Sequence, residues 1–332
     1  MPGHIPTLDV RAPTEFEQGH IPGATSFPLF DDHQREVVGT AYRKNGRQKA
    51  ILIGLEFVGQ KMRPLVEAAL KLTRHQEGER QVRLHCWRGG MRSQSVEWLL
   101  GQADIKVHRL DGGYKSFRQY TQRLFQQPWQ LVVLSGLTGA GKTRQLKLLE
   151  STGQQILDLE GLANHRGSAF GGIGQADQPT TEQFENLMAT QLRSLDPHRR
   201  IWVEDESKKV GRCVIPDDLF NQVNGGPAIF MDVPRRSRSQ VLHQDYGELD
   251  ADEMAAAITR ITKKLGGQNT NAAIEAIQAG DKLACCEILL DYYDRLYLKA
   301  TSRGLREVSR NVEIADPESS DATLRLIEAA DA

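Results

Sequence analysis

The stretch QLVVLSGLTGAGKTRQLKLLE (130–150) decides the fold of the second half of this chain. Its apolar start at 130–135 predicts a buried strand, its glycine-rich middle at 136–143 predicts a tight turn, and a helix is predicted from about Lys142 to Glu150. The middle matches the pattern G-x-x-x-x-G-K-[ST], which forms a phosphate-binding loop (P-loop) when a strand precedes it and a helix follows it. The sequence therefore predicts a P-loop here.

The residue types of this loop predict its chemistry. Backbone N–H groups wrap two phosphates, the Lys142 ammonium neutralises their outer oxygens, and the Thr143 hydroxyl can ligate Mg²⁺. The expected phosphate- or diphosphate-binding residues are Gly136, Thr138, Gly139, Ala140, Gly141, Lys142 and Thr143. The pattern identifies phosphates and not the molecule that carries them, so a nucleoside triphosphate is the default ligand.

More strands and helices follow the loop along the chain. The segments QILDLE (155–160), RIWVEDE (200–206) and AIFMDV (228–233) predict strands, and apolar residues spaced by three and four predict helix through most of 250–300. Strands that alternate with helices are typical of a parallel sheet. We therefore expect a P-loop NTPase-like α/β domain with a helical C-terminal part.

Two polar segments of this half are candidates for substrate or Mg²⁺ contacts. Glu204, Asp205 and Glu206 end a predicted strand where an acid commonly binds the metal of a P-loop, and Asp205 and Glu206 are the expected contacts among them. Arg166 and Ser168 lie in the unusual segment LDLEGLANHRGSAFGGIG (157–174). An arginine next to flexible backbone suits contact with phosphate or RNA. A solvated acidic strand end and a glycine-rich surface loop are the alternative interpretations, and no metal site is certain.

The first half shows the same alternation. TLDV (7–10), QVRLHC (81–86) and IKVHRL (105–110) predict strands, and helices are predicted between and after them, again indicating a parallel sheet. Pro128 breaks the last of these helices. We therefore predict two domains, 1–127 and 128–332.

A second site is predicted at HCWRGGMRS (85–93). Cys86 ends a strand, a helix opens near Arg92, and the glycines between them let N–H groups converge into an anion-binding nest. Such surroundings lower the pKa of a thiol and favour a reactive thiolate. The residues expected to form this loop with Cys86 are Arg88, Gly89, Gly90, Arg92 and Ser93. The alternative is a buried, inert cysteine.

Composition narrows the class of protein. Four scattered cysteines indicate no disulfide framework and favour a reducing, cytoplasmic compartment, and no apolar run is long enough to predict a membrane span. The net charge is −1, but the first 128 residues carry 19 lysines and arginines against 13 acids, and the remainder 23 against 30. A basic first half can meet a polyanion. The clusters Arg235–Arg236–Arg238 and Lys208–Lys209–Arg212 are candidate RNA contacts or solvated faces.

Two enzyme families share the Cys86 arrangement. Cysteine phosphatases have the spacing His-Cys, five residues, Arg, which this segment fits. The segments LDVRAPTEFEQGHIPGATSFPL (8–29) and LDGGYKSFR (110–118), however, closely resemble the two signatures of rhodanese-type sulfurtransferases. This resemblance implies a rhodanese-like N-terminal domain. Its cysteine loop is one residue longer than the common sulfurtransferase loop, which leaves room for a larger oxyanion.

A rhodanese-like domain followed by a P-loop domain resembles the tRNA 2-selenouridine synthases. The matching segments are CWRGGMRS (86–93), GLTGAGKT (136–143), LDLEGLANHRGSAFG (157–171), VEDESKKVGRCVIP (203–216) and YYDRLY (292–297). The resemblance implies a transferase that acts on the wobble uridine of the lysine, glutamate and glutamine tRNAs. It implies S-geranylation of 2-thiouridine by geranyl diphosphate, followed by selenation from selenophosphate.

The resemblance also implies roles for the two loops. Cys86 would form an S-selanylcysteine intermediate, and the P-loop would hold the diphosphate leaving group. No tightly bound cofactor is expected, Mg²⁺ can take part, and we expect a monomer. An ATP-dependent tRNA sulfurtransferase, a cysteine phosphatase with a nucleotide-binding domain and a non-enzymatic RNA-binding module remain as alternatives.

Overall fold

The computed structural model describes residues 5–247, 249–301 and 308–332. The chain divides into a first unit, residues 1–124, and a second unit, residues 125–332. Each unit is described by itself. The helix α5 (Gly113–Gln126) ends just before Pro128, the residue at which the sequence predicts the second domain to begin. Among the helices in the described part of the chain, none has the length and apolarity to cross a membrane.

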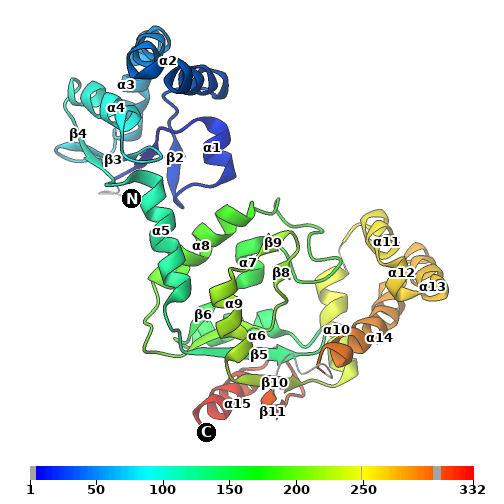
Figure 1. Cartoon of the computed structure of the whole chain (residues 1–332). Helices are drawn as coiled ribbons and strands as arrows, with labels where there is room; N and C mark the ends of the chain where they lie inside the picture. Colours follow the sequence, from blue (N-terminus) through cyan, green and yellow to red (C-terminus); the bar gives the residue numbers. More distant parts are fainter. Residues whose placement is uncertain (1–4, 248, 302–307) are drawn as a thin grey trace. The chain divides into compact units, whose positions relative to one another are not determined.

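The first unit is built on a four-stranded parallel sheet of order β2-β1-β3-β4 (Figure 1). Its strands are β1 (Thr7–Asp9), β2 (Ala24–Ser26), β3 (Arg80–His85) and β4 (Ile105–Arg109). Its other helices are α1 (Pro13–Gln18), α2 (Asp32–Gly59), α3 (Met62–Leu72) and α4 (Met91–Gly101). Strands, α3 and α4 share one core that includes Leu8, Val82 and Val96.

The long helix α2 is absent from the elements predicted by sequence. It begins with a capping box, in which Asp31 Oδ1 accepts from the Gln34 N–H at 2.8 Å and Gln34 Oε1 accepts from the Asp31 N–H at 3.3 Å. Gly46 interrupts it with a φ of 83°, a conformation that favours glycine. Its weak apolar periodicity explains why the pattern did not predict it, since most of its residues face solvent.

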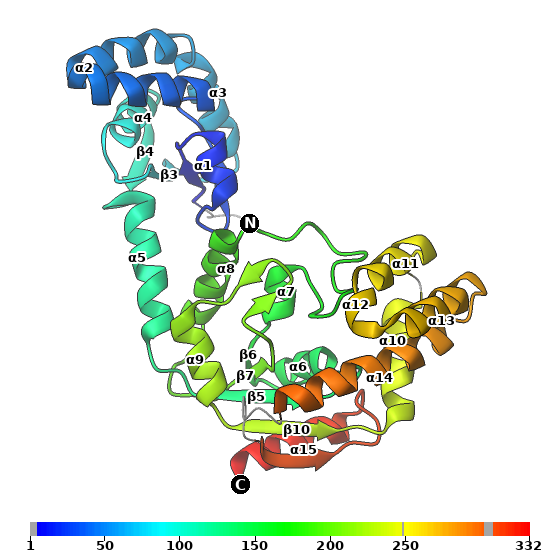
Figure 2. The same cartoon turned by 45° about the vertical axis from the view of Figure 1, so that its right-hand side comes forward.

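The second unit contains a five-stranded parallel sheet of order β11-β10-β5-β7-β6 (Figure 2). These strands are β5 (Leu131–Gly136), β6 (Gln155–Leu157), β7 (Ile201–Glu204), β10 (Ala228–Asp232) and β11 (Val308–Glu313). A two-stranded antiparallel ribbon adds β8 (Lys209–Val210) and β9 (Cys213–Val214).

Helices of this unit either pack on the sheet or form a separate helical group. The first set is α6 (Lys142–Ser151), α7 (Leu159–Ala163), α8 (Thr181–Arg193), α9 (Asp217–Gly225) and α15 (Ser320–Asp331). The second is α10 (Arg235–Tyr246), α11 (Ala251–Arg260), α12 (Thr262–Leu265), α13 (Gly267–Gln278) and α14 (Lys282–Thr301). Figures 1 and 2 show α11, α12 and α13 gathered beyond the sheet, at the ends of α10 and α14.

Predicted strands 155–160 and 200–206 were too long. The first ends at Leu157 because Asp158 caps α7, its Oδ1 accepting from the Gly161 N–H at 2.7 Å. The second ends at Glu204, and Asp205 and Glu206 follow outside the strand. The α/β class, with a helical part in the C-terminal half, is confirmed.

Candidate functional site

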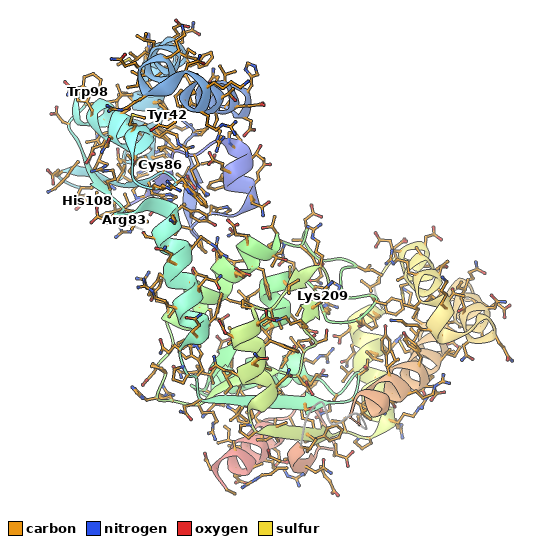
Figure 3. All side chains as sticks on the ribbon, viewed as in Figure 1. Tyr42, Arg83, Cys86, Trp98, His108 and Lys209 are labelled. Atoms are coloured by element: carbon orange, nitrogen blue, oxygen red, sulfur yellow. The ribbon has the colours of Figure 1, made fainter. Side chains whose placement is uncertain are left out.

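Cys86 follows β3 directly and lies beside the start of α4 (Figure 3). Its Sγ is 3.3 Å from Ser93 Oγ on the first turn of α4, and Ser93 Oγ donates to the Gly90 carbonyl at 3.0 Å. Cys86 is only 3% exposed. The loop predicted from HCWRGGMRS therefore forms, with Ser93 in direct contact with the sulfur.

Backbone hydrogen bonds hold this loop in place from the start of α5. The Tyr114 N–H donates to the Cys86 carbonyl at 2.8 Å, and the Lys115 N–H donates to the Trp87 carbonyl at 2.9 Å. Gly113 has a φ of +62°, and a Cβ there would lie 2.3 Å from the Cys86 carbonyl oxygen. The segment LDGGYKSFR thus acts as a support for the cysteine loop, and only glycine fits at position 113.

The loop favours the ionised thiol. Burial raises the pKa of Cys86, but other effects outweigh burial and lower the pKa below its ordinary value. These effects are hydrogen bonds from the Ser93 hydroxyl and from the Ser93 and Arg88 N–H groups, and the charge of Arg92. Such a thiol is more nucleophilic at neutral pH than an ordinary one. The remaining cysteines, Cys213, Cys285 and Cys286, are buried, and burial raises the pKa of each.

The Arg92 side chain beside the Cys86 loop is paired with a carboxylate. Its guanidinium donates to Glu15 Oε2 at 2.6 Å, and Arg35 approaches the same carboxylate at 3.7 Å. The pKa of Glu15, which burial raises, is lowered overall by Arg92 and by the Ala12 N–H. Glu15 therefore positions Arg92 and offsets part of its charge. Arg88 is exposed at the rim of the loop.

The P-loop forms at the end of β5, and α6 begins at Lys142. Lys142 Nζ donates back to the Gly136 carbonyl at 3.0 Å, which keeps the ammonium over the loop. At Gly139, with a φ of +79°, a Cβ would lie 2.6 Å from the Arg238 carbonyl oxygen, so helix α10 supports the loop from outside.

Three glutamates gather beside Thr143. Oxygens of Glu160, Glu204 and Glu206 lie within 4.8 Å of one another, and Thr143 Oγ1 donates to Glu160 Oε2 at 3.0 Å. Burial, and then mutual repulsion, raises the pKa of Glu206 to about 8 and that of Glu204 well above its ordinary range. Burial also raises the pKa of Glu160.

This cluster has the chemistry of a divalent cation site. The carboxylate of Glu204 is buried, and its Oε1 has no hydrogen-bond partner among the described residues. Carboxylate and hydroxyl oxygens are the ligands that Mg²⁺ prefers. Asp205, predicted as a candidate contact, instead accepts from Ser135 Oγ at 2.5 Å. The cluster of Glu160, Glu204 and Glu206 therefore fits Mg²⁺ better than the pair Asp205 and Glu206 would alone.

One cavity of about 570 Å³ is lined by Glu160 and Glu206 of this cluster and by the P-loop. The predicted residues Arg166, Ser168, Asp205 and Glu206 line it together with all the predicted loop residues Gly136, Thr138, Gly139, Ala140, Gly141, Lys142 and Thr143. Its other wall is formed by Val241, Leu242, Tyr246, Tyr293 and Leu296. The cavity thus places an apolar wall beside a phosphate-binding loop.

Sequence reasoning missed part of this cavity. Glu160 lies in the quoted segment 157–174, but its spacing from the P-loop gave no signal. Tyr246 was missed, and Tyr293 was quoted only within the matching segment 292–297 without a role, because contact between α10 and α14 brings the two tyrosines there. The Tyr246 hydroxyl is 3.0 Å from Ser168 Oγ, and the Tyr293 hydroxyl accepts from the Ala169 N–H at 3.2 Å.

The interpretation of Arg235, Arg236 and Arg238 as an RNA-binding cluster is wrong for Arg238, which is buried, and Arg235 is engaged in ion pairs. Arg238 is 4% exposed, is paired with Asp294 at 2.9 Å, and donates to the Thr138 carbonyl at 3.1 Å. Arg235 is paired with Glu287 and Asp291 on α14. These arginines hold α10, α14 and the P-loop together, and their charges are already neutralised.

Comparison with known proteins agrees with both halves of this structure. Residues 2–120 match the rhodanese-like domain, and residues 129–316 match the tRNA 2-selenouridine synthase AAA domain.

Relatives that match most of this chain are named tRNA 2-selenouridine synthase. A tRNA 2-selenouridine synthase of Sulfurovum sp. (strain NBC37-1) is 35% identical, over 89% of this chain and 88% of its own length. One of Aeromonas salmonicida (strain A449) is 34% identical, over 89% and 86%. Since two domain matches in this order and whole-length relatives agree, the chain belongs to the tRNA 2-selenouridine synthase family.

Proposed function

We propose that this chain is a transferase that converts 2-thiouridine of tRNA into 2-selenouridine in two half-reactions, one at each loop. The observation that carries the proposal is the presence, in one chain, of an acidified thiol in an N–H-lined loop and a separate P-loop with carboxylates and an apolar wall. Whole-length relatives named tRNA 2-selenouridine synthase support the product. The proposed position is the wobble uridine of the lysine, glutamate and glutamine tRNAs.

In the first half-reaction the P-loop binds the diphosphate of geranyl diphosphate. The thiocarbonyl sulfur of the uridine attacks the first carbon of the geranyl group, a carbon–sulfur bond forms, and the carbon–oxygen bond to diphosphate breaks. Lys142 and the loop N–H groups stabilise the charge that develops on the leaving group. Mg²⁺ held by Glu160, Glu204 and Glu206 would supply further charge stabilisation.

The apolar wall of the cavity favours an isoprenoid over a nucleoside as the group attached to the bound diphosphate. Leu242 and Leu296 provide apolar contact next to the loop. The tyrosine hydroxyls of Tyr246 and Tyr293 are engaged with Ser168 and the Ala169 N–H, so the rings can be presented to a chain without exposing an unpaired hydroxyl.

In the second half-reaction the selenium of selenophosphate attacks C2 of the alkylated uridine. A carbon–selenium bond forms, the carbon–sulfur bond breaks, and geranyl thiolate leaves. Alkylation makes this possible because a thioether is a better leaving group than a thiocarbonyl sulfur. The Cys86 loop, with its N–H groups and Arg92, provides the anion site for the selenophosphate.

We propose Cys86 as the nucleophile that removes the phosphoryl group once selenium has bonded to C2. An S-selanyl group on Cys86 joins sulfur to selenium, and its formation from a thiolate and selenophosphate removes two electrons, so that route needs an oxidant. Attack of the Cys86 thiolate on phosphorus needs none, because a sulfur–phosphorus bond forms and the phosphorus–selenium bond breaks, leaving selenium on the uridine. Water then breaks the sulfur–phosphorus bond, which releases phosphate and restores the Cys86 thiol. Intact-protein mass spectrometry separates the two, since only an S-selanyl adduct carries the isotope pattern of selenium.

Nucleoside mass spectrometry of 2-thiouridine-containing tRNA tests the function. Geranyl diphosphate alone should give S-geranyl-2-thiouridine, and addition of selenophosphate should give 2-selenouridine. Formation of selenouridine that requires ATP and not geranyl diphosphate would instead establish an ATP-dependent chalcogen transferase. Hydrolysis of an aryl phosphate by the Cys86 loop, with no change in the tRNA, would establish a phosphatase.

A further inference from the structure

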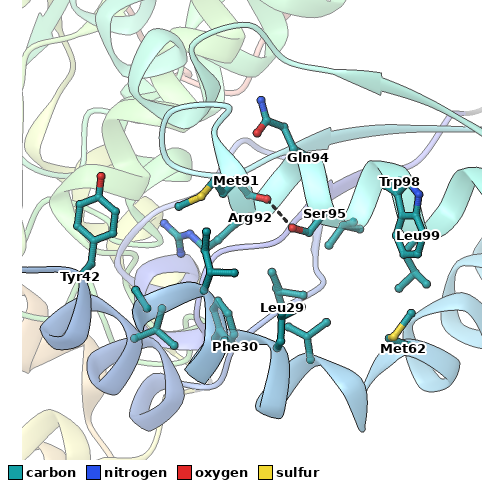
Figure 4. Close-up of a pocket in the computed structure, with 17 residues that line it drawn as sticks. Leu29, Phe30, Tyr42, Met62, Met91, Arg92, Gln94, Ser95, Trp98 and Leu99 are labelled. Carbon is teal, nitrogen blue, oxygen red and sulfur yellow. Dashed lines mark hydrogen bonds between the residues drawn. The ribbon is translucent and has the colours of Figure 1, made fainter. Parts of the chain in front are cut away.

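The first unit contains an apolar groove that the two half-reactions have not used (Figure 4). It has a volume of about 610 Å³ and lies between α2 and α4. Residues of α4 line one side, including Met91, Trp98 and Leu99, and Leu29, Phe30 and Met62 line another (Figure 4).

The groove has the size and lining of a small-molecule site. Ligand sites commonly measure about 300–1,000 Å³ and combine apolar walls with a few polar groups. Trp98 is 60% exposed and Leu55 is 61% exposed, although both are large apolar side chains. Exposed apolar surface that is gathered in one concave place marks a binding site more often than scattered apolar residues do.

One end of the groove reaches the Cys86 loop. Met91 and Arg92, at that end, are the first residues of α4, and the charge of Arg92 acts on the Cys86 sulfur. From Arg92 to Leu99 the helix rises by about 10 Å. The groove therefore runs away from the reactive sulfur along a length similar to that of an extended ten-carbon isoprenoid chain.

Charge decides which form of the isoprenoid fits. Among the described residues that line the groove, Arg92 is the only cation, and Glu15 already pairs with it at 2.6 Å. One partly neutralised cation suits a neutral thioether chain better than a free diphosphate, which needs several positive charges or a P-loop.

We propose that this groove binds the isoprenoid chain of the alkylated uridine during selenation. This inference rests on the proposed function. The chain lies along α4 while C2 of the uridine faces the selenophosphate beside Cys86. When the carbon–sulfur bond breaks, geranyl thiolate leaves with its chain in the groove. The groove thus selects S-alkylated over unmodified 2-thiouridine and holds the leaving group in place.

Two substitutions at exposed positions test the groove, namely Trp98→Ser and Leu55→Asp. Leu52→Asp is the matched control, because Leu52 is 58% exposed on the same helix as Leu55 but does not line the groove. Each protein is given tRNA that is already S-geranylated, and separately tRNA carrying the S-methyl group, with selenophosphate. S-geranylation of 2-thiouridine tRNA and thermal melting are measured in parallel.

Because apolar binding scales with the area removed from water, we expect wild type to select the geranyl substrate over the methyl one by about tenfold or more in kcat/KM. Trp98→Ser and Leu55→Asp should lose most of that preference, mainly through KM, while the rate of S-geranylation and the melting temperature stay close to those of Leu52→Asp.

Equal geranyl and methyl rates in wild type, or a preference that survives both substitutions, would overturn the inference. A change in sedimentation of the variants without a change in chain preference would identify the groove as a contact between copies. If wild type forms no S-geranylated tRNA from geranyl diphosphate but still prefers the S-geranyl substrate in selenation, the proposed first half-reaction fails and the groove stands.

Discussion

The contact between Cys86 and Ser93 determines when the thiol can react. In the thiol form Ser93 Oγ donates to the Gly90 carbonyl, and in the thiolate form the hydroxyl can turn to the sulfur 3.3 Å away. This single hydrogen bond gives the largest of the effects that lower the pKa of Cys86. The cysteine, the glycines and Ser93 could all be predicted from the sequence, but the pairing of Arg92 with Glu15 could not, since 77 residues separate them.

Ser93→Ala should raise the pKa of Cys86, because burial then acts with less opposition. The rising limb of the pH–rate profile for selenation should therefore move to higher pH. Rates with tRNA that is already S-geranylated, measured from pH 6 to 10, check this. Ser95→Ala, which removes a groove-lining hydroxyl that donates to the Met91 carbonyl, is the control and should leave the midpoint of the profile unmoved, whatever its effect on the rate. If the profile of Ser93→Ala does not move, ionisation of Cys86 does not control the rate of selenation.

The carboxylate cluster predicts an unusual dependence of stability on pH. Glu206 has a pKa of about 8 in the folded protein and an ordinary value of 4.5, so the folded state holds a proton that the unfolded state has lost between those values. Metal-free protein should therefore lose stability as pH rises through this window, and Mg²⁺ should restore more stability at pH 8 than at pH 6.

Thermal melting of wild type and Glu206→Gln, with and without Mg²⁺, measures this effect. Glu206→Gln should flatten the pH dependence and weaken the response to Mg²⁺. Glu185→Gln, on α8 and outside the cluster, serves as the control. The metal assignment is wrong if Mg²⁺ stabilises wild type and Glu206→Gln equally at pH 8.

At the scale of elements, strand–turn–helix units were the most predictable part of the fold. β5, the P-loop and α6 follow from a strong local pattern, and β3, the Cys86 loop and α4 do as well. β11 was missed because its residues pair with β10 residues 80 or 81 positions away in the chain. α15 was missed because its acidic residues obscured a buried face that includes Leu326. Long-range pairing is not encoded in local periodicity.

The support of the P-loop by α10 and α14 gives a prediction at this scale. Asp294→Ala leaves the buried Arg238 guanidinium without its carboxylate, and loss of one partner of a buried pair costs about 3–5 kcal/mol. We expect that loss of stability in urea unfolding, together with weaker diphosphate binding. Asp291→Ala removes an exposed partner of Arg235 and should cost less than about 1 kcal/mol. Equal losses would show that the Arg238 pair does not support the loop.

At the scale of the whole molecule, the near-neutral net charge of −1 requires a local surface for tRNA. The stretch 42–49 of α2 carries Arg43, Lys44, Arg47 and Lys49, holds no acid, and is exposed throughout. The predicted RNA role of the arginines on α10 is not supported, so this stretch of the basic first half is the better candidate. Its charges were visible in the sequence, but their exposure depended on the unpredicted helix.

Replacing these four cations by alanine should weaken tRNA binding. Each lost phosphate contact reduces the magnitude of the slope of log affinity against log salt by about 0.7–0.9, so loss of all four should reduce it by about three. Fluorescence anisotropy from 50 to 300 mM salt measures it, with Lys263→Ala and Lys264→Ala together on α12 as the control. An unchanged slope would place the tRNA elsewhere.

The central claim is that each loop serves one half-reaction, and measuring both half-reactions in two variants tests it most directly. Lys142→Ala removes the ammonium that stabilises the leaving diphosphate. A hydrogen bond to a charged group is worth about 1.5–3 kcal/mol, which corresponds to roughly a tenfold to hundredfold loss of rate. It should geranylate slowly and still selenate S-geranylated tRNA. Cys86→Ser should geranylate at the normal rate but form little 2-selenouridine from S-geranylated tRNA, whereas Cys213→Ser should do both. Equal loss of both half-reactions in Lys142→Ala, or normal selenation by Cys86→Ser, would contradict the account.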